Sequence, residues 1–254
     1  MRVVDYFYLQ TLQYNLSMKK TVYFQDLGKD RDYQEVWDLQ EALLAESVGV
    51  KQYNRAQEKE GKTEFKTPKN HLLFVEHPHV YTLGKSGHIE NMLANQDQLQ
   101  HIHATFVRTN RGGDITYHGP EQLVGYPIFD LDQFKPDIHL YMRNLEQVII
   151  QTLAHYGLHG ERSKGETGVW LDVGKPYARK ICAMGVKASR WVTMHGFALN
   201  VNTDLRYFEY IIPCGIKDKA VASLEQELNR ILDMEEVKEV VRNQFIEVFD
   251  IELK

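Results

Sequence analysis

The chain has 254 residues, of which 43% are hydrophobic and 26% charged, and its formal net charge is −5. This length and composition are those of an ordinary globular protein with one large domain or two small ones. The acidic balance argues against a nucleic-acid-binding protein, and no apolar run approaches the roughly 18 residues of a membrane span.

The first residues of the chain read as an extension. Met18 opens a short basic lead that runs into a strand-like segment at residues 22–24. The N-terminus also lacks the long apolar core of a signal peptide. We therefore expect residues 1–20 to form an N-terminal extension, of which residues 1–17 are dispensable, and residues 21–254 to form a single domain.

Helix and strand patterns then mix without strict alternation. Apolar residues recurring every three or four positions predict a helix over residues 34–47, and the polar stretch at 51–66 reads as a loop or a helix extension. Later patterns predict strands at 71–76, 80–83, 105–108, 123–131, 168–171, 180–186 and 196–201, a helix around 145–153, and a last helix capped by Asp233. This order predicts an α/β or α+β fold with a mixed sheet and flanking helices.

The densest group of polar and glycine residues follows the strand at 105–108. Residues 111–120 read Arg-Gly-Gly-Asp-Ile-Thr-Tyr-His-Gly-Pro. The glycines allow the backbone to approach a ligand, while Arg111, Tyr117 and His118 offer hydrogen-bond donors and a proton carrier. Each residue is also common in surface turns, so a binding loop and a packed turn remain equally supported by chemistry alone.

A cysteine on a turn and a lysine in an apolar strand indicate acyl-transfer chemistry. Cys214 is one of two cysteines in the chain and lies between Pro213 and Gly215, where the backbone can hold a thiol toward a pocket. Lys180 has mainly apolar neighbours, which is unusual for a lysine that is not paired or partly exposed. If the two side chains meet, the ammonium lowers the thiol pKa, and a shift of about two units makes the thiolate the major form. The alternative for Lys180 is an edge lysine whose ammonium reaches water.

Cys182 competes with Cys214 for this role. In a regular strand it lies two residues from Lys180, so both side chains point to the same face. A free cysteine is more often a small buried hydrophobe. The two cysteines do not make a disulfide framework, so we expect reduced thiols in a cytoplasmic protein.

No cofactor is predicted. The histidines at 77, 79, 101 and 103 match no spacing typical of metal ligands. The Gly-Lys-Ser at residues 84–86 lacks the upstream glycine of a phosphate loop. The segment His-Gly-Phe-Ala-Leu-Asn at 195–200 is a second possible pocket wall, or equally a strand entering the core.

Together these stretches resemble one family, the lipoyl(octanoyl) transferases, also called lipoate-protein ligase B. The resemblance covers about residues 20–230 and rests on motifs in the same order, at residues 111–120, 168–170, 180–181, 195–200 and 213–216. It implies one catalytic domain with a mixed sheet and flanking helices, like the catalytic fold of the biotin and lipoate protein ligases. We expect a monomer that needs no cofactor.

The resemblance implies an acyltransferase of lipoate biosynthesis. Such an enzyme moves octanoate from octanoyl-acyl carrier protein to a lysine of a lipoyl domain, in a 2-oxoacid dehydrogenase or in the glycine-cleavage H protein. Cys214 would carry the acyl group as a thioester, and Lys180 would lower its pKa and move protons. The motifs carry over these substrate-binding residues: Arg111, Gly112, Gly113, Asp114, Ile115, Thr116, Tyr117, His118, Ala183, Met184, Gly185, Gly196, Phe197 and Ala198.

Three residues depart from the family pattern, and two other functions stay open. Asp114 and Glu121 add negative charge beside a site for an acidic carrier, and Cys182 stands where a small residue is common. One alternative is an ATP-dependent lipoate or biotin ligase on the same fold, which needs no nucleophilic cysteine. The other is a carrier-binding protein without catalytic activity.

Overall fold

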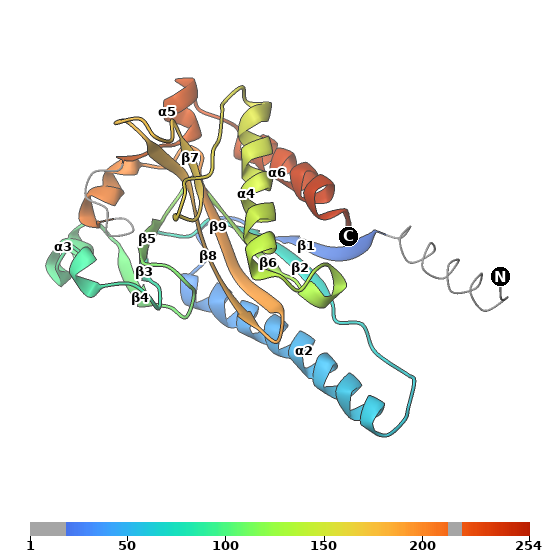
Figure 1. Cartoon of the computed structure of the whole chain (residues 1–254). Coiled ribbons are helices and arrows are strands. Elements are labelled where there is room, and N and C mark those ends of the chain that lie inside the picture. Colours follow the sequence, from blue (N-terminus) through green and yellow to red (C-terminus); the bar gives the residue numbers. More distant parts are fainter. Residues whose placement is uncertain (1–18, 213–219) are drawn as a thin grey trace.

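The computed structural model describes residues 19–212 and 220–254 (Figure 1). The expectations for residues 1–17 and the position of Cys214 lie outside the described residues. Within these ranges the chain forms one sheet of eight strands and one of three.

The larger sheet mixes parallel and antiparallel strands. Its members are β1 (Lys20–Asp26), β2 (Asn70–Val75), β6 (Gln122–Ile128), β7 (Val169–Leu171), β8 (Arg179–Ser189), β9 (Val192–Asn200), β10 (Ala220–Val221) and β11 (Ile251–Leu253). Their order is β10-β8-β9-β6-β2-β1-β11, and β7 pairs with β8 beside this path. The run from β8 through β9 and β6 to β2 is antiparallel, whereas β1 lies parallel to both β2 and β11.

The smaller sheet contains the second half of the glycine-rich motif, because β5 begins at Ile115. It consists of β3 (Val80–Leu83), β4 (Thr105–Arg108) and β5 (Ile115–His118), with β3 in the centre. Its apolar side chains, among them Tyr81 and Tyr117, form a separate core with Phe208 of the 3-10 helix η3 (Leu205–Tyr210). The other short helices are η1 (Ile89–Asn91), α3 (Gln96–His101), η2 (Leu131–Gln133) and α5 (Leu224–Leu228).

Three long helices cover the larger sheet. They are α2 (Tyr33–Lys59), α4 (Ile138–His155) and α6 (Met234–Phe249), with α2 on one face and α4 and α6 on the other (Figure 1). Alternate residues of a strand point to opposite faces, so in β2 Leu73 packs under α2 while Leu72 and Phe74 pack under α4 and α6.

These elements confirm the predicted fold class. Every predicted strand forms, with shifts of a few residues at its ends. The helix expected at 34–47 continues to Lys59, because the polar segment after it extends the helix. Asp233 caps α6 by accepting a hydrogen bond from the Glu235 amide.

Candidate active site

A pocket of about 940 Å³, including open space at its mouth, lies on the α2 side of the larger sheet. Its floor is built from the neighbouring strands β6, β9 and β8, and its other walls include β5, the loop before it and Tyr33 at the start of α2. Apolar side chains line it together with a few polar groups, as is typical of small-molecule sites.

The pocket brings together motifs that lie far apart in the sequence. All of the substrate-binding residues expected from the resemblance line it except Gly112 and Tyr117, and Lys180 lines it as well. Tyr117 lies instead in the core of the smaller sheet, where its hydroxyl is 2.7 Å from His79 Nδ1. The amide of Gly112 donates to the carbonyl of Val186 in β8 at 2.9 Å.

The sequence missed several lining residues, and most of them come from strands whose neighbours it cannot specify. His195 and Asn200 belong to the segment considered as a second pocket wall. The others are Tyr33, Gln122, Val124, Tyr126, Thr167, Trp170, Phe208, Ala220 and Val221. In β6 the period-two spacing of Gln122, Val124 and Tyr126 is the only local signal that they share a face.

The loop before β5 is held in place by backbone contacts. The Lys85 amide donates to the Arg111 carbonyl at 2.9 Å, and Gly113 has φ +88°, a conformation that favours glycine. The Asp114 carboxylate accepts from the amides of His88 and Ile115 and from Asn91 Nδ2. The loop is therefore an ordered wall of the pocket.

The buried Arg111 side chain is the first donor in a series of hydrogen bonds in which each side chain donates to the next. Its Nη2 donates to both the carbonyl and Oγ1 of Thr82, at 2.7 and 2.9 Å. Thr82 Oγ1 lies 3.3 Å from His118 Nε2, and His118 Nδ1 lies 2.9 Å from Gln122 Oε1. Burial, together with the charge of Arg111, holds the pKa of His118 well below its usual range. His118 is therefore neutral, accepts from Thr82 and donates to Gln122.

The same series continues to the strand beside Lys180. Gln122 Nε2 donates to Asn200 Oδ1 at 2.8 Å, and Asn200 Nδ2 donates to the Ala222 carbonyl at 2.9 Å. The Ala222 amide in turn donates to the carbonyl of Lys180 at 2.9 Å. The hydrogen bonds thus connect the glycine-rich loop to the backbone of Lys180.

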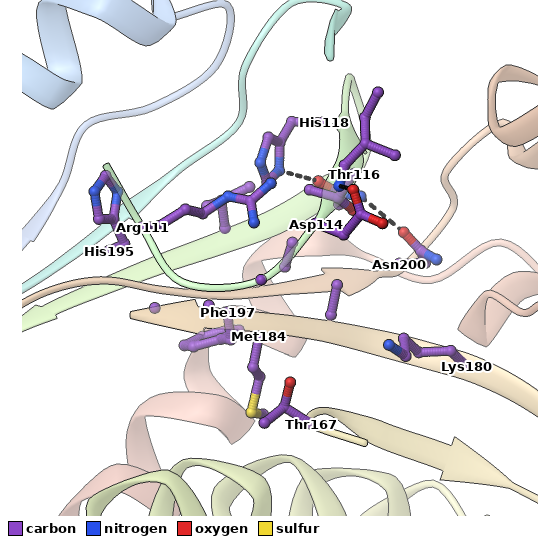
Figure 2. Close-up of a pocket in the computed structure, with 18 of the residues that line it drawn as sticks. Arg111, Asp114, Thr116, His118, Thr167, Lys180, Met184, His195, Phe197 and Asn200 are labelled. Atoms are coloured by element: carbon purple, nitrogen blue, oxygen red, sulfur yellow. Dashed lines mark hydrogen bonds between the residues drawn. The ribbon is translucent and has the colours of Figure 1, made fainter. Parts of the chain in front are cut away.

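Lys180 lies against an aromatic ring inside the pocket. The residue is 9% exposed, and its Nζ is 4.6 Å from the centroid of the Trp170 ring. Figure 2 shows the lysine at the opposite side of the drawn group from Arg111 and His195. A cation over an indole face is favourable, and more so where water is excluded.

A bulge in β8 corrects the expected orientation of Cys182. Trp170 pairs with Lys180 and Val169 pairs with Cys182, so Ile181 is an extra residue in β8. Adjacent residues of β7 point to opposite faces, and their partners therefore do so too. Cys182 is fully buried in the core under α4 and α6, and burial raises its pKa. The prediction that it shares a face with Lys180 is wrong.

Cys214 lies outside the described residues, but the residues on both sides of the gap are placed. Before it, the Ile212 amide donates to the Asn91 carbonyl at 2.8 Å. After it, Ala220 and Val221 line the pocket, and Val221 pairs with Lys180. Cys214 is six residues from Ala220 in the sequence.

Gly196 lines the pocket, but its lack of a side chain serves strand packing. A Cβ there would lie 2.1 Å from the Gly125 carbonyl oxygen and 2.7 Å from Pro127 Cδ. The absence of a side chain at this position is therefore a steric requirement of the pairing of β6 and β9.

Two features are absent from the described ranges. No helix in them is long and apolar enough to cross a membrane. They also hold no cluster of three or more His, Cys, Asp or Glu residues placed to bind a metal ion.

The chain is similar to known proteins over nearly its whole length. Residues 32–246 match the family described as lipoyl protein ligase A/B catalytic domain. An octanoyltransferase from Christiangramia forsetii is 61% identical over 238 residues, which cover 93% of this chain and 99% of the relative. One from Flavobacterium psychrophilum is 58% identical over 234 residues, covering 92% and 98%.

Solved structures share the fold at low sequence identity. A lipoate-protein ligase A bound with ATP has a TM-score of 0.64 and 16% identity, covering 93% of this chain and 88% of its own. A putative lipoate protein ligase from T. acidophilum with bound lipoic acid has a TM-score of 0.62 and 17% identity, with the same coverage. The fold expected from the resemblance is confirmed, and the chain belongs to the lipoyl protein ligase A/B catalytic domain family.

Proposed function

We propose that this protein transfers an octanoyl group to a lysine of a lipoyl domain, through a thioester on Cys214, in lipoate biosynthesis. The observation that carries the proposal is the pocket, which gathers the expected substrate residues around Lys180 and ends at the strand that follows Cys214. The high identity to octanoyltransferases supports the same reaction.

The first step forms the acyl-enzyme. The Cys214 thiolate attacks the thioester carbon of the octanoyl donor, and a new carbon–sulfur bond replaces the donor's. The donor sulfur leaves and takes a proton from the Lys180 ammonium. One thioester replaces another, so the exchange is nearly isoenergetic.

The second step releases the product. The neutral amine of the acceptor lysine attacks the Cys214 thioester and gives a proton to the neutral Lys180 amine. The amide bond forms as the carbon–sulfur bond breaks, which restores the Cys214 thiolate and the Lys180 ammonium. Neither step needs a metal ion or a nucleotide.

The environment of Lys180 includes an aromatic ring. The Trp170 ring lies where a cation over its face would be favourable, and an ammonium there would stabilise the Cys214 thiolate. Arg111 would stay a fixed wall, because its guanidinium is already bonded to Thr82.

The partners follow from this reaction. The donor would be octanoyl-acyl carrier protein, and the acceptors would be lipoyl domains and the H protein. The reaction would take place in the cytoplasm, where a thiol stays reduced.

The alternative is an ATP-dependent lipoate ligase on the same fold. The solved ligases are only 15–17% identical to this chain, so they support the fold and not the reaction. Transfer from octanoyl-carrier protein without ATP is expected here, and a strict requirement for ATP would favour the ligase.

Intact-mass analysis after mixing with octanoyl-carrier protein tests the intermediate. We expect one octanoyl adduct in the wild type and in Cys182→Ala, and none in Cys214→Ala. An adduct that survives Cys214→Ala and disappears in Cys182→Ala would overturn the assignment. Binding of the carrier protein with no adduct and no transfer in the wild type would indicate the non-catalytic binding protein.

A further inference from the structure

The strands β6, β9 and β8 form the floor of the pocket, and their pairing shows which lining residues lie near Lys180 and which lie far from it. At the end near Lys180, Asn200 of β9 pairs with Gln122 of β6. Ala198, which pairs with Val124 of β6 and with Ala183 of β8, lies further along. Since a strand rises about 3.3 Å per residue, these registers order the lining residues by their distance from Lys180.

The middle of this pocket is small and apolar. Val124, Ala183 and Ala198 line it side by side, and none of them has a polar side chain. An alkyl chain gains about 0.8 kcal/mol for each buried methylene, which is roughly fourfold in affinity. A straight acyl chain running from the Lys180 end would therefore bind along these residues.

At the other end the pocket lining becomes polar. We name the residues Tyr33, Arg111, Tyr126 and His195 the far wall; all four line the pocket and are at most 7% exposed. Figure 2 shows Arg111 and His195 together at the side of the drawn group away from Lys180. Tyr126 lies beyond Val124 on the same face of β6.

Hydrogen bonds hold three members of the far wall. The Arg111 guanidinium donates to Thr82, and the Tyr126 hydroxyl lies 2.8 Å from His77 Nε2. His195 Nε2 lies 2.8 Å from Asn110 Oδ1. Moving Arg111 or Tyr126 would break a buried hydrogen bond, which costs about 1–3 kcal/mol, and moving His195 would break a partly buried one.

The backbone of His195 is fixed as well. Its φ is +60°, rare for a residue other than glycine, and its amide donates to Gln40 Oε1 of α2 at 2.9 Å. Such a conformation persists where the surroundings determine it. The hydrogen bond to Gln40 of α2 therefore holds His195 in the far wall.

Tyr33 is held differently. Its ring is stacked on His118 at 5.8 Å between centroids, and its hydroxyl makes no hydrogen bond to another described residue. A smaller residue here would open space without leaving a hydrogen-bonding partner unpaired.

We propose that the far wall sets the longest acyl chain that the pocket accepts, and that Tyr33 is the residue that closes it. Methylenes that lie on the apolar middle add affinity, whereas any beyond it would have to displace side chains that are hydrogen-bonded in place. This inference rests on the proposed function, because it takes an acyl chain as the occupant.

Binding of straight-chain fatty acids with six to twelve carbons to the full-length protein, by calorimetry, tests the inference. In the wild type we expect affinity to rise about fourfold per methylene up to octanoate and then to stop rising. In Tyr33→Ala the rise should continue, so that dodecanoate gains at least about tenfold relative to octanoate. Tyr33→Leu serves if Tyr33→Ala does not fold.

Two controls sharpen the result. Tyr33→Phe keeps the ring and should keep the wild-type length preference, and so should Tyr53→Ala, at an exposed tyrosine of the same helix. Ala198→Leu fills the middle of the pocket and should weaken octanoate more than hexanoate.

The outcomes separate the inference from the proposed function. An unchanged order of chain lengths in folded Tyr33→Ala or Tyr33→Leu would overturn the role of the far wall. A wild type that binds none of the fatty acids would count against the acyl pocket itself, and so against the proposed function.

Discussion

The ammonium of Lys180 and the ring of Trp170 face each other across the paired strands β7 and β8, with Nζ 4.6 Å from the ring centroid. This contact favours the charged lysine and, in the proposed reaction, the Cys214 thiolate beside it. In that reaction the indole would contribute to thiol reactivity through Lys180.

Trp170→Leu tests this contribution. Loss of the contact removes about 1 kcal/mol from the ammonium, so thiol alkylation at neutral pH should slow by about fivefold. The pH at half-maximal alkylation should rise, and Trp170→Phe should give an intermediate value. Equal pH profiles for all three proteins would show that the ring has no such effect.

Because Cys182 is buried, the number of cysteines that react with a thiol reagent should differ between the native and the unfolded protein. In the native protein a thiol reagent should modify one cysteine quickly, and in urea it should modify two. Cys182→Ala should retain octanoyl transfer and lose about 1 kcal/mol of unfolding free energy. Rapid modification of two thiols in the native state would contradict the burial of Cys182.

Gly125 is predicted to be required for packing. A Cβ there would lie 2.1 Å from the Phe197 ring, so Gly125→Ala should lower the free energy of unfolding by about 1–3 kcal/mol. Gly49→Ala is the matched control, because the structure leaves open space at this position in α2. It should stabilise the protein by up to about 1 kcal/mol, since alanine favours a helix. Urea denaturation measures both, and similar destabilisation by both variants would contradict the steric explanation.

Asn200 is expected to stabilise the strand next to Lys180. Asn200→Leu removes one of the two acceptors of Gln122 Nε2 and the side-chain donor to the Ala222 carbonyl, which should cost about 1–3 kcal/mol in unfolding free energy. Asn54→Leu breaks two hydrogen bonds on the surface of α2 and should cost less. Thermal or urea denaturation measures both variants. Equal losses of unfolding free energy would contradict a larger contribution from the buried Asn200 side chain.

Buried neutral histidines should make the protein sensitive to mild acid. Burial lowers the pKa of His77 to about 4 and that of His195 to about 3, and it holds the pKa of His118 well below its usual range. As pH falls below the ordinary histidine pKa of about 6.5, the unfolded chain takes up protons that the native state does not. Stability should therefore be fully present above about pH 6.5 and fall toward pH 4, by up to about 1.4 kcal/mol per pH unit for each histidine.

Urea midpoints between pH 7 and pH 4.5 measure this effect. Replacing His77 by Phe removes one titrating group and should flatten the slope, although it also leaves the Tyr126 hydroxyl without its partner. A midpoint independent of pH over this range would contradict the burial of all three rings.

Local patterns in the sequence predicted the elements that build the site. The strands at 80–83 and 105–108 form over the predicted residues, because period-two apolar spacing and flanking glycines are local signals. The residues of the glycine-rich loop line the pocket largely as expected, since that motif is one continuous segment.

The remaining features depend on how distant strands meet. Nothing in residues 180–186 reveals that Ile181 is an extra residue, since the bulge exists only relative to β7. Likewise Tyr126 reaches the pocket because β6 lies beside β9. That neighbourhood has no local sequence signal.

The extra residue at Ile181 has a consequence for variation in this part of the chain. If β7 and β8 paired without this bulge while Ile181 stayed in the chain, the alternation of β8 would become regular, and Lys180 and Cys182, two residues apart, would point to the same side of the sheet. An ammonium would then enter the apolar core, or a thiol would enter the pocket, although every side chain named in the site was still present. The irregular pairing of these two strands is therefore as much a requirement for the proposed chemistry as the identity of the lysine.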